Sequence, residues 1–143
     1  MRTEFINACS QDADYVFSVI SLLENADLDF IRFKEIYTLN LSDKNINYFL
    51  ILYDGQKCGF ASLYFHSLLH HQGVVAEIQE LFIEEPFRGK GIGKSAISFL
   101  HSAAKERNAV LLEVCTNKKR PGAQEFYKKS AFAESHYKYT LEL

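Results

Sequence analysis

The spacing of apolar residues divides the chain into alternating stretches of helical and strand type. Helical spacing predicts three helices, from Ser10 to about Asn25, from Asp27 to Leu39 and from Gly91 to Arg107. Short apolar runs predict strands at residues 3–8, 48–53, 58–65, 74–83 and 110–115. A short helix is expected at residues 123–130, followed by one or two last strands within residues 132–143. This order predicts an α/β (α+β) fold built on a mixed sheet.

Turn residues and element order indicate how the strands pair. Asp54-Gly55 joins two strand-type runs and is a strong hairpin signal, while Gly59 suggests a bulge or a close backbone approach. The helix between the runs at residues 74–83 and 110–115 forms a crossover, which makes these two strands parallel. Because open sheets bind ligands at the carboxyl ends of strands, we expect a ligand where this parallel pair parts.

A basic, glycine-rich turn follows the strand predicted at residues 74–83. Arg88–Lys94 reads RGKGIGK, so three glycines let the backbone bend and bring several N–H groups to one point. The positive end of the following helix adds to these groups, and the product suits a phosphate or pyrophosphate. The dinucleotide fingerprint and the P-loop are excluded, because the turn has neither their spacing nor their place in the element order.

Composition and charge remove several classes of function. The 143 residues are expected to form a single domain, residues 1–143, of ordinary globular composition. A net charge of −2 gives no general attraction for nucleic acid or for an anionic membrane. No apolar run is long enough to span a bilayer and no signal-peptide core is visible, which predicts a cytoplasmic protein. The three cysteines lack zinc-site spacing and are expected to be free thiols.

The glycine turn and a later helix together resemble a known family. Arg88–Gly93 fits the [Q/R]xxGx[G/A] signature of the Gcn5-related N-acetyltransferase (GNAT) superfamily. Phe126–Phe132 is similar to its later FYxxxGF motif, with Ala131 in place of the usual glycine. The resemblance implies a mixed, mostly antiparallel sheet of six to seven strands, about four helices and a splayed parallel pair. It also implies transfer of an acetyl group from acetyl-CoA to a primary amine.

The resemblance also assigns the cofactor site. It implies that backbone N–H groups of the glycine turn hold the CoA pyrophosphate, that the pantetheine arm runs beside the preceding strand, and that a side-chain amide bonds the arm. The positions concerned are Arg88, Gly89, Lys90, Gly91, Ile92, Gly93 and Lys94 for the pyrophosphate, and Leu81, Phe82, Ile83 and Asn117 for the arm. Tyr127 matches the family's general acid and would also lie against the cofactor, although a tyrosine here could simply pack its helix.

Two glutamates are candidates for the base that deprotonates the amine. Glu77 stands where part of the family carries a glutamate base, and we favour it for that reason. Glu80 lies three residues on, where strict alternation would turn its side chain to the other face of the sheet. A bulge, common in the family at this point, would break the alternation, so both glutamates stay candidates.

A narrower resemblance suggests the acceptor. Residues 69–71, 76–81, 116–120 and 135–140 look like the family's aminoalkylphosphonate N-acetyltransferases, which implies a small amine that bears a phosphonate, with a divalent cation as a further candidate cofactor. A phosphonate needs basic or metal ligands. The available groups are His70, His71, Arg32, Lys118, Lys119 and Arg120. With His66, the two histidines form a cluster that would serve a metal or an anion, or simply lie on the surface as solvated loop residues.

Other functions remain open at this point. A polyamine or a protein amine would use the acidic residues around the first two helices, which are Glu24, Asp27, Asp29 and Glu35. A non-catalytic module that only holds CoA is the alternative from another class. Because no cysteine lies in the glycine turn or in the helix that carries Tyr127, we predict direct transfer in a ternary complex. The last strands, with Tyr137 and Tyr139, could pair between subunits in a homodimer.

Overall fold

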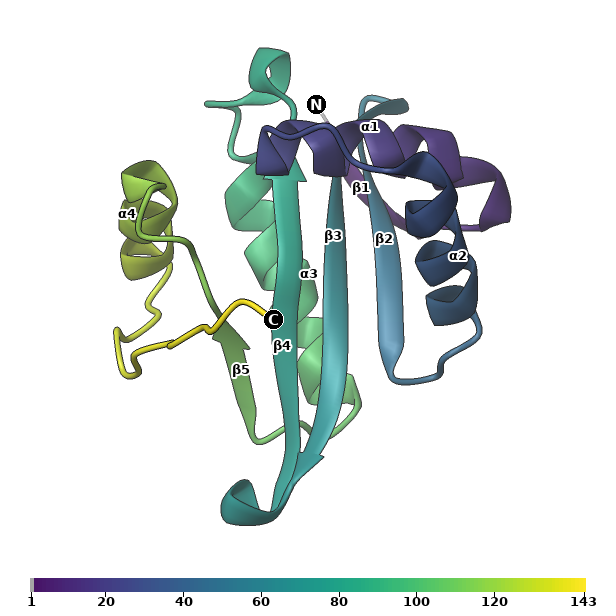
Figure 1. Ribbon diagram of the computed structural model, residues 1–143. Coiled ribbons are helices and arrows are strands. Elements are labelled where there is room, and N and C mark those ends of the chain that lie inside the picture. Colours follow the sequence, from purple (N-terminus) through teal and green to yellow (C-terminus); the bar gives the residue numbers. More distant parts are fainter. Residues whose placement is uncertain (1) are drawn as a thin grey trace.

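The computed structural model describes residues 2–143, which form an open twisted sheet with helices on both faces (Figure 1). Its elements, in chain order, are β1 (Thr3–Asn7), α1 (Ala13–Glu24), α2 (Phe30–Leu41), β2 (Ile46–Tyr53), β3 (Gln56–Leu68), β4 (Gly73–Ile83), α3 (Ile92–Glu106), β5 (Leu111–Val114) and α4 (Pro121–Lys129). The strands lie in the order β1-β2-β3-β4-β5. All neighbours are antiparallel except β4 and β5, so the predicted mixed sheet with one parallel pair is confirmed.

The predicted strand count was wrong. The described residues form a five-stranded sheet rather than six or seven strands, and the segment 132–143 forms no strand in the part of the chain that the structure describes. Its alternating aromatic residues were taken as strand residues, but Tyr137 is 82% exposed and Tyr139 is 89% exposed. Alternation alone does not make a strand, because a strand also needs backbone hydrogen bonds to a neighbour, and this segment pairs with neither edge strand, β1 or β5. The segment instead runs as an extended tail from α4 across β5 toward β4 (Figure 1).

The two faces of the sheet carry separate apolar cores. α3 packs on one face, where Ile92, Ala96 and Leu100 meet strand residues such as Leu63 and Ile78. α1 and α2 cover the other face. Their buried residues Ala13, Val16, Val19 and Tyr37 pack with Leu50 of β2 and Phe60 of β3. Beyond this core, the same face carries polar side chains of β3 and β4, among them Ser62, Glu77 and Glu80.

Local sequence signals explain most element boundaries. Asp54 and Gly55 have φ of 49° and 81°, as the predicted hairpin turn requires. A Cβ on Gly59 would collide with the backbone oxygen of Phe82, which confirms the predicted close approach. α2 begins at Phe30 rather than at Asp27, because the side chain of Asp29 caps the helix by accepting a hydrogen bond from the backbone N–H of Arg32 (3.1 Å).

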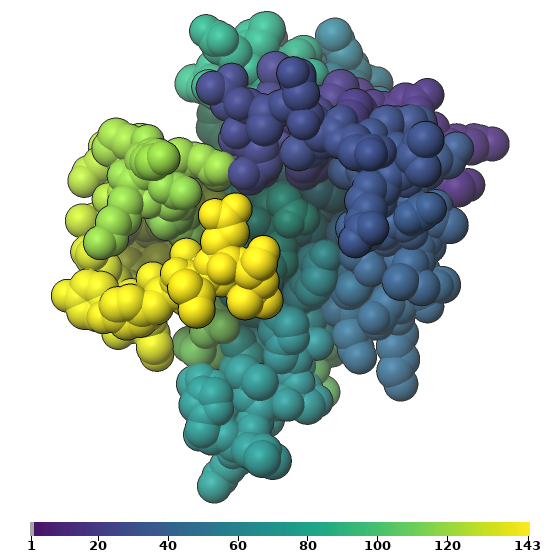
Figure 2. All heavy atoms as spheres, in the orientation of Figure 1, coloured from purple at the N-terminus to yellow at the C-terminus, as the bar shows by residue number. Residues whose placement is uncertain are grey.

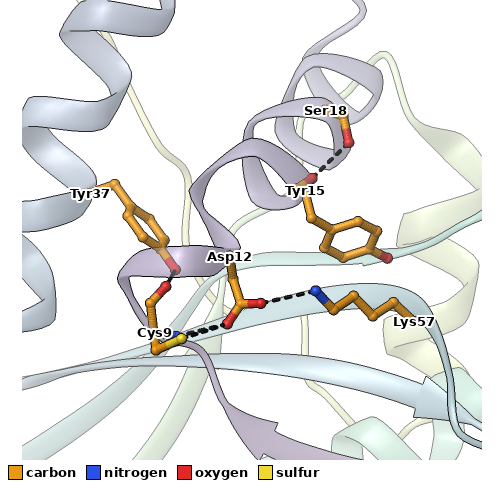
Figure 3. A network of polar contacts seen from close by, with 6 residues as sticks. All are labelled: Cys9, Asp12, Tyr15, Ser18, Tyr37 and Lys57. Atoms are coloured by element: carbon orange, nitrogen blue, oxygen red, sulfur yellow. Dashed lines mark hydrogen bonds and ion pairs between the residues drawn. The ribbon is translucent and has the colours of Figure 1, made fainter.

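A small polar network fixes the start of α1 over the sheet (Figure 3). Asp12 accepts hydrogen bonds from the backbone N–H of Cys9 (2.9 Å) and from Nζ of Lys57 on β3 (2.9 Å). The hydroxyl of Tyr37 on α2 donates to the carbonyl of Cys9 (2.7 Å). Although burial raises the pKa of Asp12, these hydrogen bonds outweigh it and leave the pKa below its usual value. The network therefore joins α1, α2 and β3, and orients α1 across one face of the sheet.

The three histidines around the β3–β4 connection do not all lie in a loop. β3 is longer than predicted and ends at Leu68, so His66 lies in a strand and not in the loop where the sequence suggested it. His70 and His71 do lie in the connection, in the short helical turn Leu69–His71. Among residues 2–143, no helix is long and apolar enough to cross a membrane.

Candidate active site

The parallel strands β4 and β5 lie at one edge of the sheet and part midway along β4. Their pairing runs from Val75 opposite Leu111 to Ile78 opposite Val114, whereas β4 continues to Ile83. β5 ends at Val114 and the chain turns away toward α4. Figure 2 shows the resulting hollow, floored by the teal strands and bordered by α4, the tail and the end of α1. The predicted splayed pair is therefore present, and it opens beside α4.

A β-bulge in β4 lies directly at this parting. β3 and β4 pair Leu63 with Ile78 but Ala61 with Leu81, so β4 carries one extra residue between these points. The extra residue breaks the alternation of β4. As a result Glu77, which lies opposite Tyr64, and Glu80, which bonds Ser62, both turn to the same face of the sheet. The bulge expected from the family pattern is confirmed.

Glu80 is held closely by its surroundings. Ser62 donates a hydrogen bond from Oγ to Oε1 of Glu80 (2.8 Å), and the same Oγ accepts one from the backbone N–H of Glu80 (3.0 Å). Burial raises the pKa of Glu80, the bond from Ser62 lowers it, and the charge of Glu24 raises it again, so that the pKa lies above its usual value. A carboxylate with a raised pKa is a stronger base than an exposed one, which is the property a general base needs.

Glu77 has partners of a different kind. Its Oε1 accepts a hydrogen bond from the side-chain amide of Gln79 and lies 3.3 Å from Nε2 of His66. Its side chain is 19% exposed and that of His66 is 39% exposed. Glu77 thus forms part of a polar surface along β3 and β4, whereas Glu80 lies deeper and nearer to the parting of the strands.

Sequence reasoning missed the hydroxyl groups of this face. Ser62 is the one buried polar residue within residues 2–143, and its signal was a serine inside the otherwise apolar run of β3. Tyr48 and Tyr64 form a second group, in which Asn40 donates from Nδ2 to both phenol oxygens (2.7 and 3.3 Å). Burial, the neighbouring Tyr48 and the charge of Glu80 raise the pKa of Tyr64, so it stays a neutral hydroxyl. Tyr48 and Asn40 come from β2 and α2, and no local pattern joins them.

Tyr127 lies on α4, the helix that borders the hollow opposite β4 (Figure 2). Its ring packs edge-on against Phe126 and Phe132, with centroid distances of 5.2 and 5.6 Å. Burial raises the pKa of its phenol to about 12, against a smaller lowering by the charge of Arg120. Tyr127 therefore keeps its proton at neutral pH. It packs its helix, as the simpler interpretation expected, and it also holds a proton that could be donated.

The glycine turn has the backbone that the sequence predicted. Gly89 and Gly91 have φ of 76° and 79°, and no described atom lies within 4 Å of where a Cβ would stand on either. Both are exposed at the start of α3, which no side chain of residues 2–143 caps. Open space, bare N–H groups and a helix dipole together fit the pyrophosphate of CoA.

The basic side chains of this turn have local contacts of their own. Arg88 donates from Nε to the carbonyl of Ile83 (2.9 Å), and its guanidinium lies 5.2 Å from the ring centre of Phe82. Nζ of Lys90 lies 5.4 Å from the ring centre of Tyr53. These contacts brace the turn against β4 and β2. An anion at this turn would therefore meet mainly backbone N–H groups, together with the exposed Lys94 on the first turn of α3.

The structure gives a packing reason for glycine at position 93 that the family signature did not reveal. A Cβ at this position would lie 3.2 Å from the ring of Phe126 on α4. The glycine therefore lets α4 approach α3 closely, next to Tyr127. One of the three glycines thus supports the position of the candidate acid rather than the phosphate.

The edge of β4 beyond the parting could hold an extended ligand. Leu81, Phe82 and Ile83 pair with β3 on one side, while β5 has already ended on the other. Past β5, Oγ1 of Thr116 is buried without a hydrogen-bond partner in the described chain. A strand-like arm with amide groups, such as pantetheine, fits such an edge. Asn117 instead closes its own turn, because its Oδ1 accepts a hydrogen bond from the backbone N–H of Lys119 (2.9 Å).

The candidate groups for the acceptor anion are not gathered at one place. His70 and His71 lie at the far end of the β3–β4 hairpin, away from α2 and α4 (Figure 1). Arg32 is exposed on the first turn of α2, and Lys118 is exposed in the loop before α4. Arg120, which precedes α4, is the one near Tyr127, and its Nη2 lies 3.2 Å from Oε1 of Glu24. Within residues 2–143 no group of three or more His, Cys, Asp or Glu side chains could hold a metal ion.

Comparison with known proteins agrees with this geometry. A model of the acetyltransferase (GNAT) family matches residues 14–132. The chain belongs to this family. The aminoalkylphosphonate N-acetyltransferase of Salmonella typhimurium is 35% identical over 140 residues, which cover 98% of this chain and 91% of that protein. The chain is accordingly an N-acetyltransferase, and the family to which it belongs uses acetyl-CoA.

Solved structures show the same fold. A transcriptional regulator from Bacillus halodurans has a TM-score of 0.90 at 21% identity, covering 99% of this chain and 100% of that chain. An aminoglycoside N-acetyltransferase in complex with CoA has a TM-score of 0.85 at 14% identity, covering 99% of this chain and 95% of that chain. At these identities the likeness establishes the GNAT fold and leaves the acceptor to other arguments.

Proposed function

We propose that the chain transfers the acetyl group of acetyl-CoA to the primary amine of a small anionic molecule, in the first place an aminoalkylphosphonate. The observation that carries this proposal is the position of Glu80, held by Ser62 in the bulge where β4 leaves β5, with Tyr127 on α4, the helix that borders the same hollow (Figure 2). A base on one side and a protonated phenol on the other are what amine acetylation requires. The full-length similarity to the Salmonella enzyme supports the phosphonate.

The cofactor would be held by the groups that fit it. Backbone N–H groups of residues 89–94 would bind the pyrophosphate, and the edge of β4 at residues 81–83 would accept the arm. When bound, acetyl-CoA supplies an activated thioester. The chain then has to orient an amine toward it, remove one proton from the ammonium form and hold a second proton for the leaving group.

Glu80 is the proposed base. Its raised pKa and its half-buried place beside the parting suit proton removal from an ammonium group better than the position of Glu77, which is engaged with His66 and Gln79. Ser62 keeps Oε1 of Glu80 in a fixed orientation. Glu77 would instead contribute to the polar wall of the acceptor pocket.

Tyr127 is the proposed acid. Its pKa of about 12 means that Oη carries a proton throughout the neutral range. The nearby charge of Arg120 lowers that pKa and therefore favours release of the proton. With no cysteine within the glycine turn or α4, direct transfer between the two substrates in a ternary complex is the simplest mechanism.

A panel of acceptors tests the proposal. Thiol release from acetyl-CoA would be measured with an aminoalkylphosphonate, the matching amino acid, a polyamine and a peptide amine, each with and without a divalent cation. The cation is included because a phosphonate binds such ions and His66 and Glu77 are ligands of the right type. The proposal predicts the highest kcat/KM for the phosphonate. Preference for the polyamine would favour the acidic residues Glu24, Asp27, Asp29 and Glu35 as the acceptor site.

A further inference from the structure

An ion pair bridges two elements that lie 96 residues apart in the chain. Glu24 is the last residue of α1, and Arg120 directly precedes α4. Oε1 of Glu24 lies 3.2 Å from Nη2 of Arg120, and the two side chains are 52% and 37% exposed. The pair thus links the end of α1 to the start of α4, and both of these elements border the hollow beside β4 (Figure 2).

This pair acts electrostatically on both proposed catalytic groups. The charge of Glu24 raises the pKa of Glu80, and the charge of Arg120 lowers the pKa of Tyr127. Each partner is therefore close enough to one reacting group to influence its ionisation. Arg120 directly precedes α4, which borders the hollow beside β4, the strand that carries Glu80 (Figure 2). Two of the other candidate cations, Lys118 and Lys119, are exposed in the loop before α4.

We propose that Arg120 is the contact for the acceptor's anion and that Glu24 occupies it in the free enzyme as an internal stand-in, which the anion must displace. This inference deepens the proposed function and rests on it. The displacement is physically reasonable, because an exposed ion pair contributes little stability and Glu24 can turn into solvent. A phosphonate or carboxylate offers Arg120 the same kind of charge-assisted hydrogen bonds that Glu24 gives it.

The variant Glu24→Gln should bind anionic acceptors more tightly than the wild type. Breaking the same internal pair precedes the binding of every anionic acceptor, so removing the charge of Glu24 should tighten all of them by a common factor. For an exposed pair that factor is about two- to fivefold. Arg120→Gln should weaken the same ligands by about tenfold or more, because a charge-assisted contact is lost.

The experiment measures binding without turnover. Dissociation constants for 2-aminoethylphosphonate, β-alanine and propylamine would be measured by calorimetry with CoA present, on wild type, Glu24→Gln and Arg120→Gln. Propylamine keeps the amine and lacks the anion. The matched control is Glu134→Gln, which breaks another exposed ion pair, that of Lys128 on α4 with Glu134 in the tail (3.5 Å). Thermal unfolding would verify that all variants fold.

The expected result is tighter binding of both anions by one factor in Glu24→Gln, weaker binding of both in Arg120→Gln, and no such change for propylamine or in Glu134→Gln. Unchanged or weaker anion binding in Glu24→Gln overturns the inference, as does full anion affinity in Arg120→Gln. The binding result can be told apart from a failure of the proposed acetyl transfer. If the binding pattern holds but no thiol is released from acetyl-CoA, the anion site stands and acetyl transfer to this acceptor fails.

Discussion

Glu77 and Glu80 lie three residues apart and on one face of the sheet, yet their surroundings differ. The pKa of Glu80 is raised by burial, whereas Glu77 accepts hydrogen bonds at the polar surface. We predict that Glu80→Gln lowers kcat by about 10²- to 10⁴-fold, the usual contribution of a general base. Glu77→Gln should change kcat much less. Thiol release at saturating substrates measures both.

The free energy of unfolding shows whether Glu80→Gln lowers activity by disturbing the fold. Because the pKa of Glu80 is raised in the folded chain, its ionised form destabilises the fold once the pH exceeds that pKa. Glu80→Gln should therefore keep the free energy of unfolding, or increase it, at neutral pH. A large loss of kcat in Glu77→Gln, with Glu80→Gln active, would reverse the assignment of the base.

Ser62 is predicted to act on the rate through Glu80. Its hydrogen bond favours the ionised carboxylate and lowers the pKa of Glu80. The base works when ionised, so kcat/KM rises with pH through this pKa, and Ser62→Ala should move the acidic limb of the profile to higher pH. The exposed Ser67 on the same strand gives the control variant Ser67→Ala. An acidic limb that stays in place in Ser62→Ala would remove Ser62 from the mechanism.

At the scale of elements, the glycine turn offers a matched pair of positions. Gly91 at the start of α3 and Gly55 in the β2–β3 hairpin have φ of 79° and 81°, and both have open space around them. A valine at either place should lower the free energy of unfolding by about 1–2 kcal/mol. Only Gly91→Val should raise the KM for acetyl-CoA. Equal effects of the two variants on that KM would argue against the turn as the pyrophosphate site.

The end of α4 contains a residue in an unfavourable conformation. Ala131 has φ of 68°, in the left-handed region, which explains why the family motif has glycine there. Ala131→Gly removes a strain of about 1–2 kcal/mol, from which the greater freedom of glycine in the unfolded chain takes back about 0.4–1 kcal/mol. Denaturant unfolding should therefore show a net stabilisation of about 0 to 1.6 kcal/mol. A destabilised variant would show that the turn does not strain Ala131.

Elements with strong local signals were predictable from the sequence. The hairpin at Asp54-Gly55, the crossover that makes β4 and β5 parallel, and the glycine turn all follow from turn chemistry and spacing. The strands predicted after Phe132 are absent from the described residues, because a strand needs backbone hydrogen bonds to a neighbour and alternation alone does not supply them. The choice between Glu77 and Glu80 needed the bulge and its partner Ser62, and the pair of Glu24 and Arg120 joins residues too distant for any local pattern.

At the scale of the whole molecule, the sheet brings the two halves of the proposed reaction to one opening. The glycine turn follows β4, α4 follows β5, and the two strands part between them. α1 and α2 close one face, and the tail runs across the opening toward β4 (Figure 1). This arrangement suits simultaneous binding of acetyl-CoA and an amine. The homodimer stays a prediction, for which sedimentation of the purified chain is the measurement.

The most direct test of this account is the initial rate of thiol release over a grid of acetyl-CoA and 2-aminoethylphosphonate concentrations, with the acetylated amine identified by mass spectrometry. The account predicts one acetylated amine for each thiol released and lines that intersect in a double-reciprocal plot, as a ternary complex requires. Parallel lines would indicate a covalent acetyl-enzyme and contradict direct transfer. Tight binding of CoA without thiol release for any amine would contradict the central claim and identify a non-catalytic CoA-binding module.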